Sequence, residues 1–258
     1  MTIPEPRLIP GELLARLARF GRVYLLDSVT STNDHAFSLA DRREPAIVLA
    51  ERQTAGRGRF RRVWYSDPDS LTFSLLLFFD DPDDPALRQL TQLVALSICR
   101  AIETRAGLKP GIRWPNDVML DEGKVCGVLC EQRKDAVAVG CGLNVNQPGF
   151  PEELGLPDAV SLRMVAGREF EKLELLDSLL AGFHRALDEA RTDRLPALLA
   201  DIRSRSAILH RRAEIRTLFR RHIGTVVDID SEGRAVLRTD SGRLVVVNSG
   251  QVRSVRCS

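Results

Sequence analysis

The stretch Gln53-Thr54-Ala55-Gly56-Arg57-Gly58-Arg59 carries the strongest structural signal in the chain. An apolar run flanks it on each side, Ala46 to Ala50 and Leu71 to Phe79, and each run is typical of a buried strand. The stretch therefore predicts a loop that joins two core strands and is positioned by a rigid scaffold. Its glycines let backbone N–H groups turn toward one point, and its arginines supply planar charged groups that bind carboxylate or phosphate.

Two later segments also suit anion binding, Arg113-Trp114-Pro115-Asn116-Asp117 and Lys124. Together with the arginines of the loop, Lys124 would neutralise a carboxylate that meets a polyphosphate, two groups that otherwise repel each other. Asn116 and Asp117 would orient a phosphate or magnesium, or accept a proton.

Other polar and aromatic side chains would complete such a site. Trp64 offers an apolar face to a heteroaromatic base, while Ser31, Thr32 and Gln53 offer hydrogen bonds to a neutral polar head group. Each also has an ordinary structural explanation. Ser31 fits the N-cap of a helix with Asp34 completing a capping box, Trp64 fits a core aromatic, and Lys124 fits a surface lysine.

The composition is that of an ordinary globular protein. The chain has 258 residues, 44% hydrophobic and 28% charged, with a formal net charge of +2, so the overall charge indicates no polyanion partner. Five cysteines at irregular spacing and four scattered histidines give no disulfide framework or metal centre. No signal peptide or membrane-length apolar run is present, and we therefore expect a cytoplasmic protein.

Periodicity predicts a mixture of helices and strands followed by an all-β tail. The expected helices cover Gly11 to Phe20, a segment starting at Ser31, Leu87 to Ala106, Leu173 to Arg191 and Leu195 to Arg205. The expected strands, besides the two that flank the loop, are Val23 to Leu26, one beginning at Arg113, Val118 to Leu120, Val125 to Glu131 and Ala136 to Val145. Gly140 and Gly142 inside the last strand indicate close approach by a ligand or another backbone. Beyond Ser206 the expected strands are Ile223 to Ile229, Arg234 to Thr239 and Arg243 to Val247, which indicate a small barrel.

In order, the chain carries Ser31-Thr32-Asn33, the glycine–arginine loop, Trp64, the Arg113 to Asp117 segment, Lys124-Val125-Cys126-Gly127 and Gly140-Cys141-Gly142-Leu143-Asn144-Val145-Asn146. This set and its order resemble the biotin protein ligases, which attach biotin to a lysine of carboxylase carrier domains. The resemblance covers about Ser28 to Asn146 and is looser over the tail. It implies an α/β fold of the α+β type. A mixed sheet flanked by helices, like that of class II synthetases, would occupy residues 1–208, and an SH3-like barrel would occupy residues 209–258.

The resemblance also implies a two-step reaction. Biotin would react with ATP, in the presence of Mg²⁺, to give biotinyl-5′-AMP, and a lysine of a biotin carboxyl carrier protein would then take the biotin and release AMP. It implies no bound metal centre, DNA or membrane partner, and it leaves a homodimer open. Some family members carry an N-terminal DNA-binding domain, but only about 20 residues precede the first expected strand here, which favours a monofunctional enzyme.

Residue roles follow from the same resemblance. The implied biotin-binding residues are Ser31, Thr32, Asn33, Gln53, Gly56, Arg57, Lys124 and Gly127. The implied ATP or adenylate-binding residues are Arg57, Arg59, Arg62, Trp64, Asn116, Lys124 and Asn144. The implied catalytic residues are Lys124, Arg59 and Asp117, with Asp117 as a candidate to receive the proton of the acceptor lysine.

The loop should close over a hydrolysable adenylate, so we expect Thr54 to Val63 to be mobile without ligand and ordered with biotinyl-AMP. Arg61 stands where the family often has glycine, which bears on how the loop closes.

Two alternatives remain open from the sequence. One is a lipoate or octanoate ligase or transferase on the same scaffold. The paired arginine loop and the Trp114-Pro115-Asn116-Asp117 segment favour biotin, because a bicyclic urea needs polar partners that a plain acyl chain does not. The other is a nucleic-acid-binding regulator, motivated by basic clusters at Arg57 to Arg62 and Arg211 to Arg221. The second cluster would instead steer an acidic carrier domain if the ligase interpretation holds.

Overall fold

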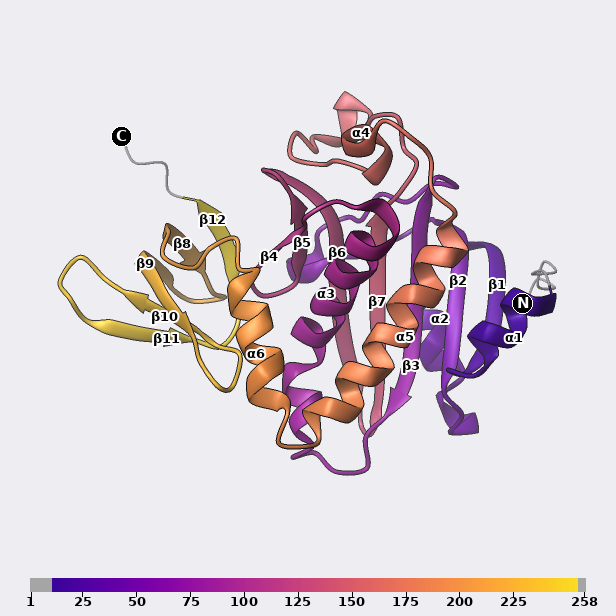
Figure 1. Cartoon of the computed structure of the whole chain (residues 1–258), viewed down its shortest axis with the longest axis horizontal. Helices are drawn as coiled ribbons and strands as arrows, with labels where there is room; N and C mark the ends of the chain where they lie inside the picture. Colours follow the sequence, from indigo (N-terminus) through magenta and orange to yellow (C-terminus); the bar gives the residue numbers. More distant parts are fainter. Residues whose placement is uncertain (1–10, 255–258) are drawn as a thin grey trace.

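The computed structural model describes residues 11–254, apart from the side chains of Arg61, Arg253 and Ser254. Figure 1 shows a large sheet with helices packed along it and a smaller sheet beside one end. The large sheet contains seven strands in the order β1-β2-β3-β7-β6-β5-β4. Their bounds are β1 (Arg22–Val29), β2 (Ala46–Gln53), β3 (Ser70–Phe78), β4 (Gly111–Arg113), β5 (Asp117–Leu120), β6 (Gly123–Arg133) and β7 (Ala136–Asn144). Only the β1–β2 pair is parallel, so the sheet is mixed as expected.

The helices are α1 (Gly11–Ala18), α2 (Thr32–Ser38), α3 (Pro85–Ala106), α4 (Leu162–Ala166), α5 (Lys172–Ala190) and α6 (Leu195–Ser204). Short 3₁₀ turns cover η1 (Ala40–Arg42), η2 (Arg59–Arg61) and η3 (Glu152–Leu154). The long helix α3 has clear local stop and start signals. Asp84 caps its N-terminus by accepting a bond from the Ala86 N–H at 2.8 Å, and Gly107 ends it in a left-handed conformation.

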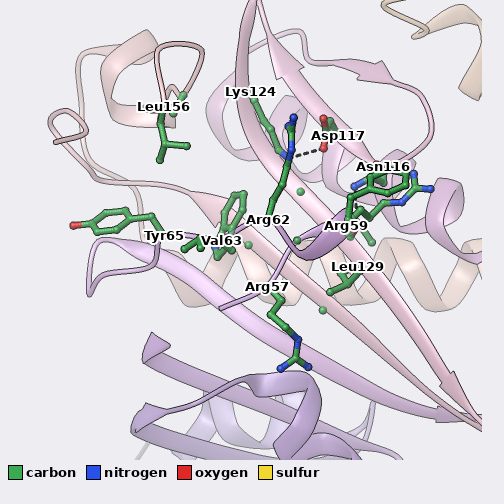
Figure 2. Close-up of a pocket in the computed structure, with 18 of the residues that line it drawn as sticks. Arg57, Arg59, Arg62, Val63, Tyr65, Asn116, Asp117, Lys124, Leu129 and Leu156 are labelled. Atoms are coloured by element: carbon green, nitrogen blue, oxygen red, sulfur yellow. Dashed lines mark hydrogen bonds and ion pairs between the residues drawn. The ribbon is translucent and has the colours of Figure 1, made fainter. Parts of the chain in front are cut away.

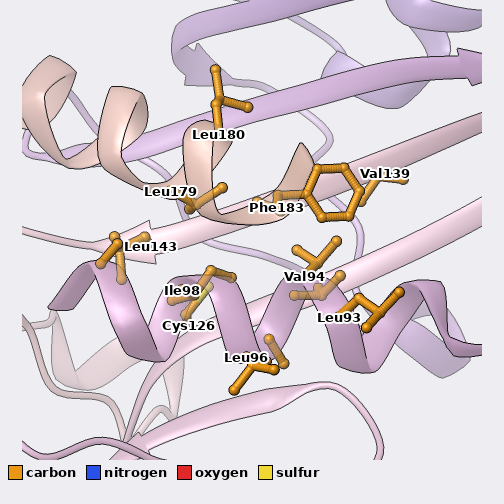
Figure 3. Close-up of a cluster of buried hydrophobic side chains, with 14 of the residues drawn as sticks. Leu93, Val94, Leu96, Ile98, Cys126, Val139, Leu143, Leu179, Leu180 and Phe183 are labelled. Atoms are coloured by element: carbon orange, nitrogen blue, oxygen red, sulfur yellow. The ribbon is translucent and has the colours of Figure 1, made fainter. Parts of the chain in front are cut away.

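The main core lies between one face of the sheet and the pair α3 and α5. Figure 3 shows leucines and Phe183 of these helices meeting Val139 and Leu143 of β7. The opposite face is covered by α2 over β2, β3 and β7 only, in a smaller cluster around Phe37 and Leu76. On that face α2 covers only part of the sheet. The part formed by β5 and β6 is therefore available for a site.

The tail folds into a five-stranded antiparallel sheet, ordered β11-β10-β9-β8-β12, which fits an SH3-like domain. Its strands are β8 (Arg212–Arg216), β9 (Arg221–Ile229), β10 (Ala235–Arg238), β11 (Leu244–Val247) and β12 (Gln251–Ser254). The sequence predicted β9, β10 and β11 but missed β8 and β12. Both strands are short, and β8 has an arginine at each end and a buried glutamate, Glu214, between the buried Ala213 and Ile215, so it lacks the alternation typical of a half-buried strand.

Trp114 joins the small sheet to the large one. It leaves the end of β4 and lies buried in the core of the small sheet beside Ile215 and Leu237. Its indole N–H donates to the carbonyl of Gly233 at 2.8 Å, and Gln92 of α3 donates to the same carbonyl at 2.6 Å. The β9–β10 turn is thus fixed against α3 and the end of β4.

Two local predictions were wrong. The strand expected to begin at Arg113 ends there, because its backbone pairs upstream through Ile112 with residues 205–207. The capping box at Ser31 does not form, although Ser31 does occupy the N-cap position. Asp34 instead makes two hydrogen bonds to Arg57, at 2.7 and 2.9 Å, and this charge-assisted pair takes the place of the local cap.

Candidate active site

Glycines of β6 and β7 form the floor of a cleft on the face of the sheet that α2 leaves open, and side chains of the site pack closely onto them. On β7, Gly140 and Gly142 point to this face, while their neighbours Val139 and Cys141 point to the main core. Gly127 of β6 lies opposite Gly142 in the register, so glycines adjoin across the two strands. A Cβ on Gly142 would lie 2.1 Å from the Trp64 ring, and one on Gly140 would lie 2.5 Å from Asn33 Oδ1. The sequence predicts close approach by a ligand or another backbone at these glycines; the structure shows the close approach, but the approaching groups are side chains.

One end of the cleft holds a buried polar network. Ser74 of β3 donates to Asn33 Oδ1 at 2.6 Å, and its oxygen lies 2.7 Å from Thr32 Oγ1. The backbone N–H and the hydroxyl of Thr32 both donate to Gln53 Oε1, at 2.8 and 3.1 Å. Asn33 also donates to Glu131 at 2.8 Å. The network fixes the side chains that begin α2, so their positions are set before any ligand arrives.

Arg57 closes this end of the cleft. Besides its two bonds to Asp34, it lies 3.7 Å from Glu131, and these acceptors raise the pKa of its guanidinium. The hydrogen bonds from Arg57 are the leading cause that holds the pKa of Asp34 below its usual value. Figure 2 shows Arg57 directed toward α2 and away from Lys124 and Asp117. Its charge is therefore partly neutralised by protein carboxylates.

A second cationic group occupies the opposite end. Lys124 Nζ lies 2.6 Å from Asp117 Oδ1, while Arg113 lies 2.9 Å from the other oxygen of the same carboxylate. The backbone of Lys124 is held on both sides. The Lys124 N–H donates to the Asp158 carbonyl, and the Lys124 carbonyl accepts from the Val160 N–H. Its ammonium also lies 5.5 Å from the centroid of the Trp64 ring. Lys124 is thus a fixed and only partly exposed cation on the cleft wall, which excludes the surface-lysine explanation.

Arg59 bridges the glycine–arginine loop to the small sheet. It donates to Asn116 Oδ1 at 3.2 Å and to the carbonyl of Gly250 at 3.4 Å, and it also bonds the Ser249 hydroxyl. Figure 2 shows it lying against Asn116. Burial lowers the pKa of the Arg59 guanidinium. The C-terminal sheet therefore contributes to one rim of the cleft.

The loop itself folds back as a small hairpin. The Trp64 N–H donates to the carbonyl of Gly56 at 2.9 Å, and the Gly58 N–H donates to the carbonyl of Arg62 at 2.7 Å. A Cβ at Gly56 would lie 2.6 Å from the carbonyl oxygen of Trp64, so glycine is required where the two arms cross. The Trp64 indole N–H is buried and finds no acceptor among residues 11–254. It is a donor available to a bound molecule.

The structure brings almost all of the sequence-predicted residues into this one cleft. Those lining it are Ser31, Thr32, Asn33, Gln53, Arg57, Arg59, Arg62, Trp64, Asn116, Asp117, Lys124, Gly127 and Asn144. Gly56 does not line it and acts on the loop instead. The sequence did not predict a role for Ser74. Its signal was that every second residue from Ser70 to Ser74 is polar inside an otherwise apolar run. The sequence also did not predict that Gly250 to Val252 of the small sheet line the cleft.

Two features are absent from the described residues, a cluster of metal ligands and a membrane-spanning helix. Within 11–254 no three His, Cys, Asp or Glu side chains gather as a metal site would require. No helix in that part of the chain is long and apolar enough to cross a bilayer.

Comparison with known proteins assigns the chain to a family. Residues 24–146 match the biotin/lipoate A/B protein ligase family, and residues 220–253 match the biotin protein ligase C terminal domain. The biotin–[acetyl-CoA-carboxylase] ligase of Paracoccus denitrificans is 32% identical over 234 residues, covering 86% of this chain and 96% of that protein. The chain belongs to the biotin protein ligase family. The ligase of the same description from Mycobacterium tuberculosis is 32% identical over 215 residues, covering 81% and 79% of the two chains.

The architecture of the family is shared as well. The solved biotin protein ligase from Aquifex aeolicus, in complex with biotin and ATP, has a TM-score of 0.79 to this structure at 29% identity. The match covers 91% of this chain and 99% of that one, so it includes both the large sheet and the tail. The predicted fold class is confirmed.

Proposed function

We propose that this protein is an ATP-dependent biotin protein ligase that forms biotinyl-5′-AMP and transfers biotin to a lysine of a biotin carboxyl carrier protein. The observation that carries the proposal is the cleft itself. A polar network and a cationic end stand at opposite ends of a glycine floor, which suits a long ligand with a neutral polar head and an anionic tail. The family match and the biotin and ATP complex of the Aquifex relative support the same assignment.

In the first step, the biotin carboxylate oxygen attacks the α-phosphorus of ATP and pyrophosphate leaves. Lys124 and Arg59 stand where their charges would stabilise the negative charge that grows on the α-phosphate. The head group of biotin would lie against Ser31, Thr32, Asn33 and Gln53, beside Gly127 and closed in by Arg57. The ureido oxygen and N–H groups of biotin need such partners, since burial without hydrogen bonds is costly.

The adenylate end would lie toward the barrel. Trp64 and Asn144 would hold the adenine end, and Asn116 and Arg62 would lie near ribose or phosphates. Mg²⁺ would enter as part of the ATP complex and be held through the phosphates.

In the second step, the amine nitrogen of the acceptor lysine attacks the acyl carbon of biotinyl-AMP, and AMP leaves. The amine must lose a proton, and Asp117 is our candidate to receive it. Its carboxylate lies between Lys124 and Arg113 on the wall of the cleft, which supports this role. We further propose that the catalytic unit ends at residue 208, that 209–258 forms the barrel, and that the protein acts in the cytoplasm without DNA.

Ser74→Ala should weaken biotin binding. Loss of its hydroxyl leaves Asn33 and Thr32 without the group that fixes them, and a hydrogen bond of this kind contributes about 0.5–1.5 kcal/mol. We expect the KM for biotin to rise about 3–10-fold with kcat nearly unchanged. Ser97→Ala is the matched control, because Ser97 is equally buried but bonds only within α3. An unchanged KM for biotin in Ser74→Ala would show that the network does not position the head group.

Biotinyl-AMP should order the loop from Thr54 to Val63. Phe60 and Val63 are exposed at the loop tip, so they have apolar surface to bury when the loop closes. Limited proteolysis should cut this loop quickly in the free protein and slowly after incubation with biotin and ATP. Equal cleavage rates with and without the adenylate would contradict closure.

The proposal is tested by mass spectrometry of an apo biotin carrier domain incubated with the protein, ATP and biotin. We expect the mass of a single biotin to be added. Transfer of octanoate or lipoate in place of biotin would retain the scaffold and overturn the substrate, and the biotin-specific C-terminal match argues against that outcome.

A further inference from the structure

Two large apolar side chains are exposed at the tip of the β8–β9 hairpin. Leu218 is 80% exposed and Phe219 is 92% exposed, and they are the two central residues of the turn from Thr217 to Arg220. The turn is closed on itself: the Thr217 N–H donates to the Arg220 carbonyl at 2.8 Å, and the Arg220 N–H donates to Thr217 Oγ1 at 3.0 Å. Leu218 and Phe219 are therefore presented to solvent by a hydrogen-bonded turn, which is the arrangement of a contact element.

This tip adjoins the mouth of the active-site cleft. Gln251 of β12 lines the cleft and pairs with Arg216, the last residue of β8 before the turn. Gly250 also lines the cleft, accepts a bond from Arg59, and packs so closely on β8 that a Cβ there would lie 2.4 Å from Ile215. Figure 1 shows β8 and β12 on the side of the small sheet that faces β4 and β5, with β10 and β11 projecting away. A macromolecule that reaches into the cleft from this rim would meet the tip.

The charge around the tip favours an acidic partner. Arg216, Arg220 and Arg221 flank the two apolar residues, and Glu214 is the one carboxylate paired with any of them in the described part of the chain. An apolar contact surrounded by cations complements an apolar spot with carboxylates around it. Other arginines of the basic cluster are already paired, Arg212 with Asp240 and Arg211 with Glu122. The cationic surplus of the cluster is thus concentrated at the tip.

We propose that the Leu218–Phe219 tip is the docking element for the biotin-accepting carrier domain in the second half-reaction. The inference rests on the proposed ligase function, because only that reaction requires a whole protein domain to bring a lysine to the cleft. In the proposed reaction biotin and ATP enter the cleft, whereas the body of the carrier must rest on its rim. Leu218 and Phe219 of the tip are far more exposed than Leu156, an apolar side chain that lines the cleft outside the loop around Trp64 and is 36% exposed.

The test compares two double variants of the full chain. Leu218→Ser with Phe219→Ser removes the apolar contact, and Leu244→Ser with Val246→Ser is the matched control. Leu244 and Val246 are also exposed, at 57% and 49%, but they lie on β11 at the opposite edge of the same sheet. Three rates are measured for each protein: pyrophosphate release with biotin and ATP, biotin transfer to hydroxylamine, and biotin transfer to a purified apo carrier domain of a bacterial acetyl-CoA carboxylase.

We expect the tip variant to lose about tenfold or more in kcat/KM for the carrier domain, the size of effect found for truncated hot-spot residues. Pyrophosphate release and transfer to hydroxylamine should match the wild type, which also shows that the variant is folded. The control variant should match the wild type in all three rates. Carrier kcat/KM within about twofold of wild type in the tip variant would overturn the proposal.

Loss of a dimer in sedimentation with unchanged carrier kinetics would likewise overturn it, since the tip would then serve a second copy of this chain. Failure of the wild type to transfer biotin to any nucleophile would instead remove the proposed function.

Discussion

Lys124→Ala should slow the formation of biotinyl-AMP by about 10²–10³-fold, the loss typical when one preorganised charge-stabilising group is removed. Lys124 Nζ is held at the cationic end of the cleft by Asp117 and by the backbone contacts of its own residue. In the ground state its charge is balanced by the Asp117 carboxylate. As the α-phosphate accumulates charge, the same ammonium needs only a small shift from Asp117 to reach it, and Arg113 remains as the partner of Asp117.

This arrangement also predicts what the substitution will not do. Because Asp117 keeps Arg113 at 2.9 Å, no buried carboxylate is left unpaired, and the free energy of unfolding should change by about 1 kcal/mol or less. Lys109→Ala is the matched control, since Lys109 is an exposed lysine outside the cleft. Pyrophosphate release in single-turnover experiments measures the rate directly. A decrease of less than about tenfold would assign the charge stabilisation to Arg59 alone.

The membership of the site was readable from the sequence because each part has a local signature. Alternating Gly and Arg predicts an anion-binding loop, and Gly140 and Gly142 inside a strand predict close approach. The arrangement of those parts was not readable. Ser31 to Asn33, Gly142 and Lys124 line one cleft because β3, β7 and β6 are neighbours in the sheet, an order set by long-range pairing that no local pattern encodes.

The errors have the same origin. At Asp34 the sequence favours a capping box, but a bidentate ion pair with a residue far along the chain is stronger than a local cap and prevails. Ser74 was missed because it lies in a run that looks uniformly buried. The polar character of one face of this strand indicates a site only once the cleft next to it is known. The strand β8 was missed because its arginines suggest a solvated segment. One of their carboxylate partners, Asp240, lies after β10 and is far from β8 in the sequence.

Trp114→Ala should lower the free energy of unfolding by about 3–5 kcal/mol, the range for removing a fully packed large aromatic side chain. Trp114 is 2% exposed and belongs to the core of the small sheet, although it comes from the end of β4 in the large one. Its removal leaves a cavity at the junction and deletes the bond to the Gly233 carbonyl. Urea unfolding followed by far-ultraviolet circular dichroism measures the change.

Trp114→Phe is a milder change than Trp114→Ala, because phenylalanine retains an aromatic ring but lacks the N–H donor and part of the volume of the indole. Gln92 still bonds the Gly233 carbonyl at 2.6 Å, so that variant should lose about 1–2 kcal/mol. A loss below about 1 kcal/mol in Trp114→Ala would mean that the two sheets are held together without this side chain.

The effect of Trp114→Ala should extend to activity, since the small sheet supplies Ser249 and Gly250 to Arg59. A small sheet released from its position would leave Arg59 without those partners, and biotinyl-AMP formation should fall even where the large sheet remains folded.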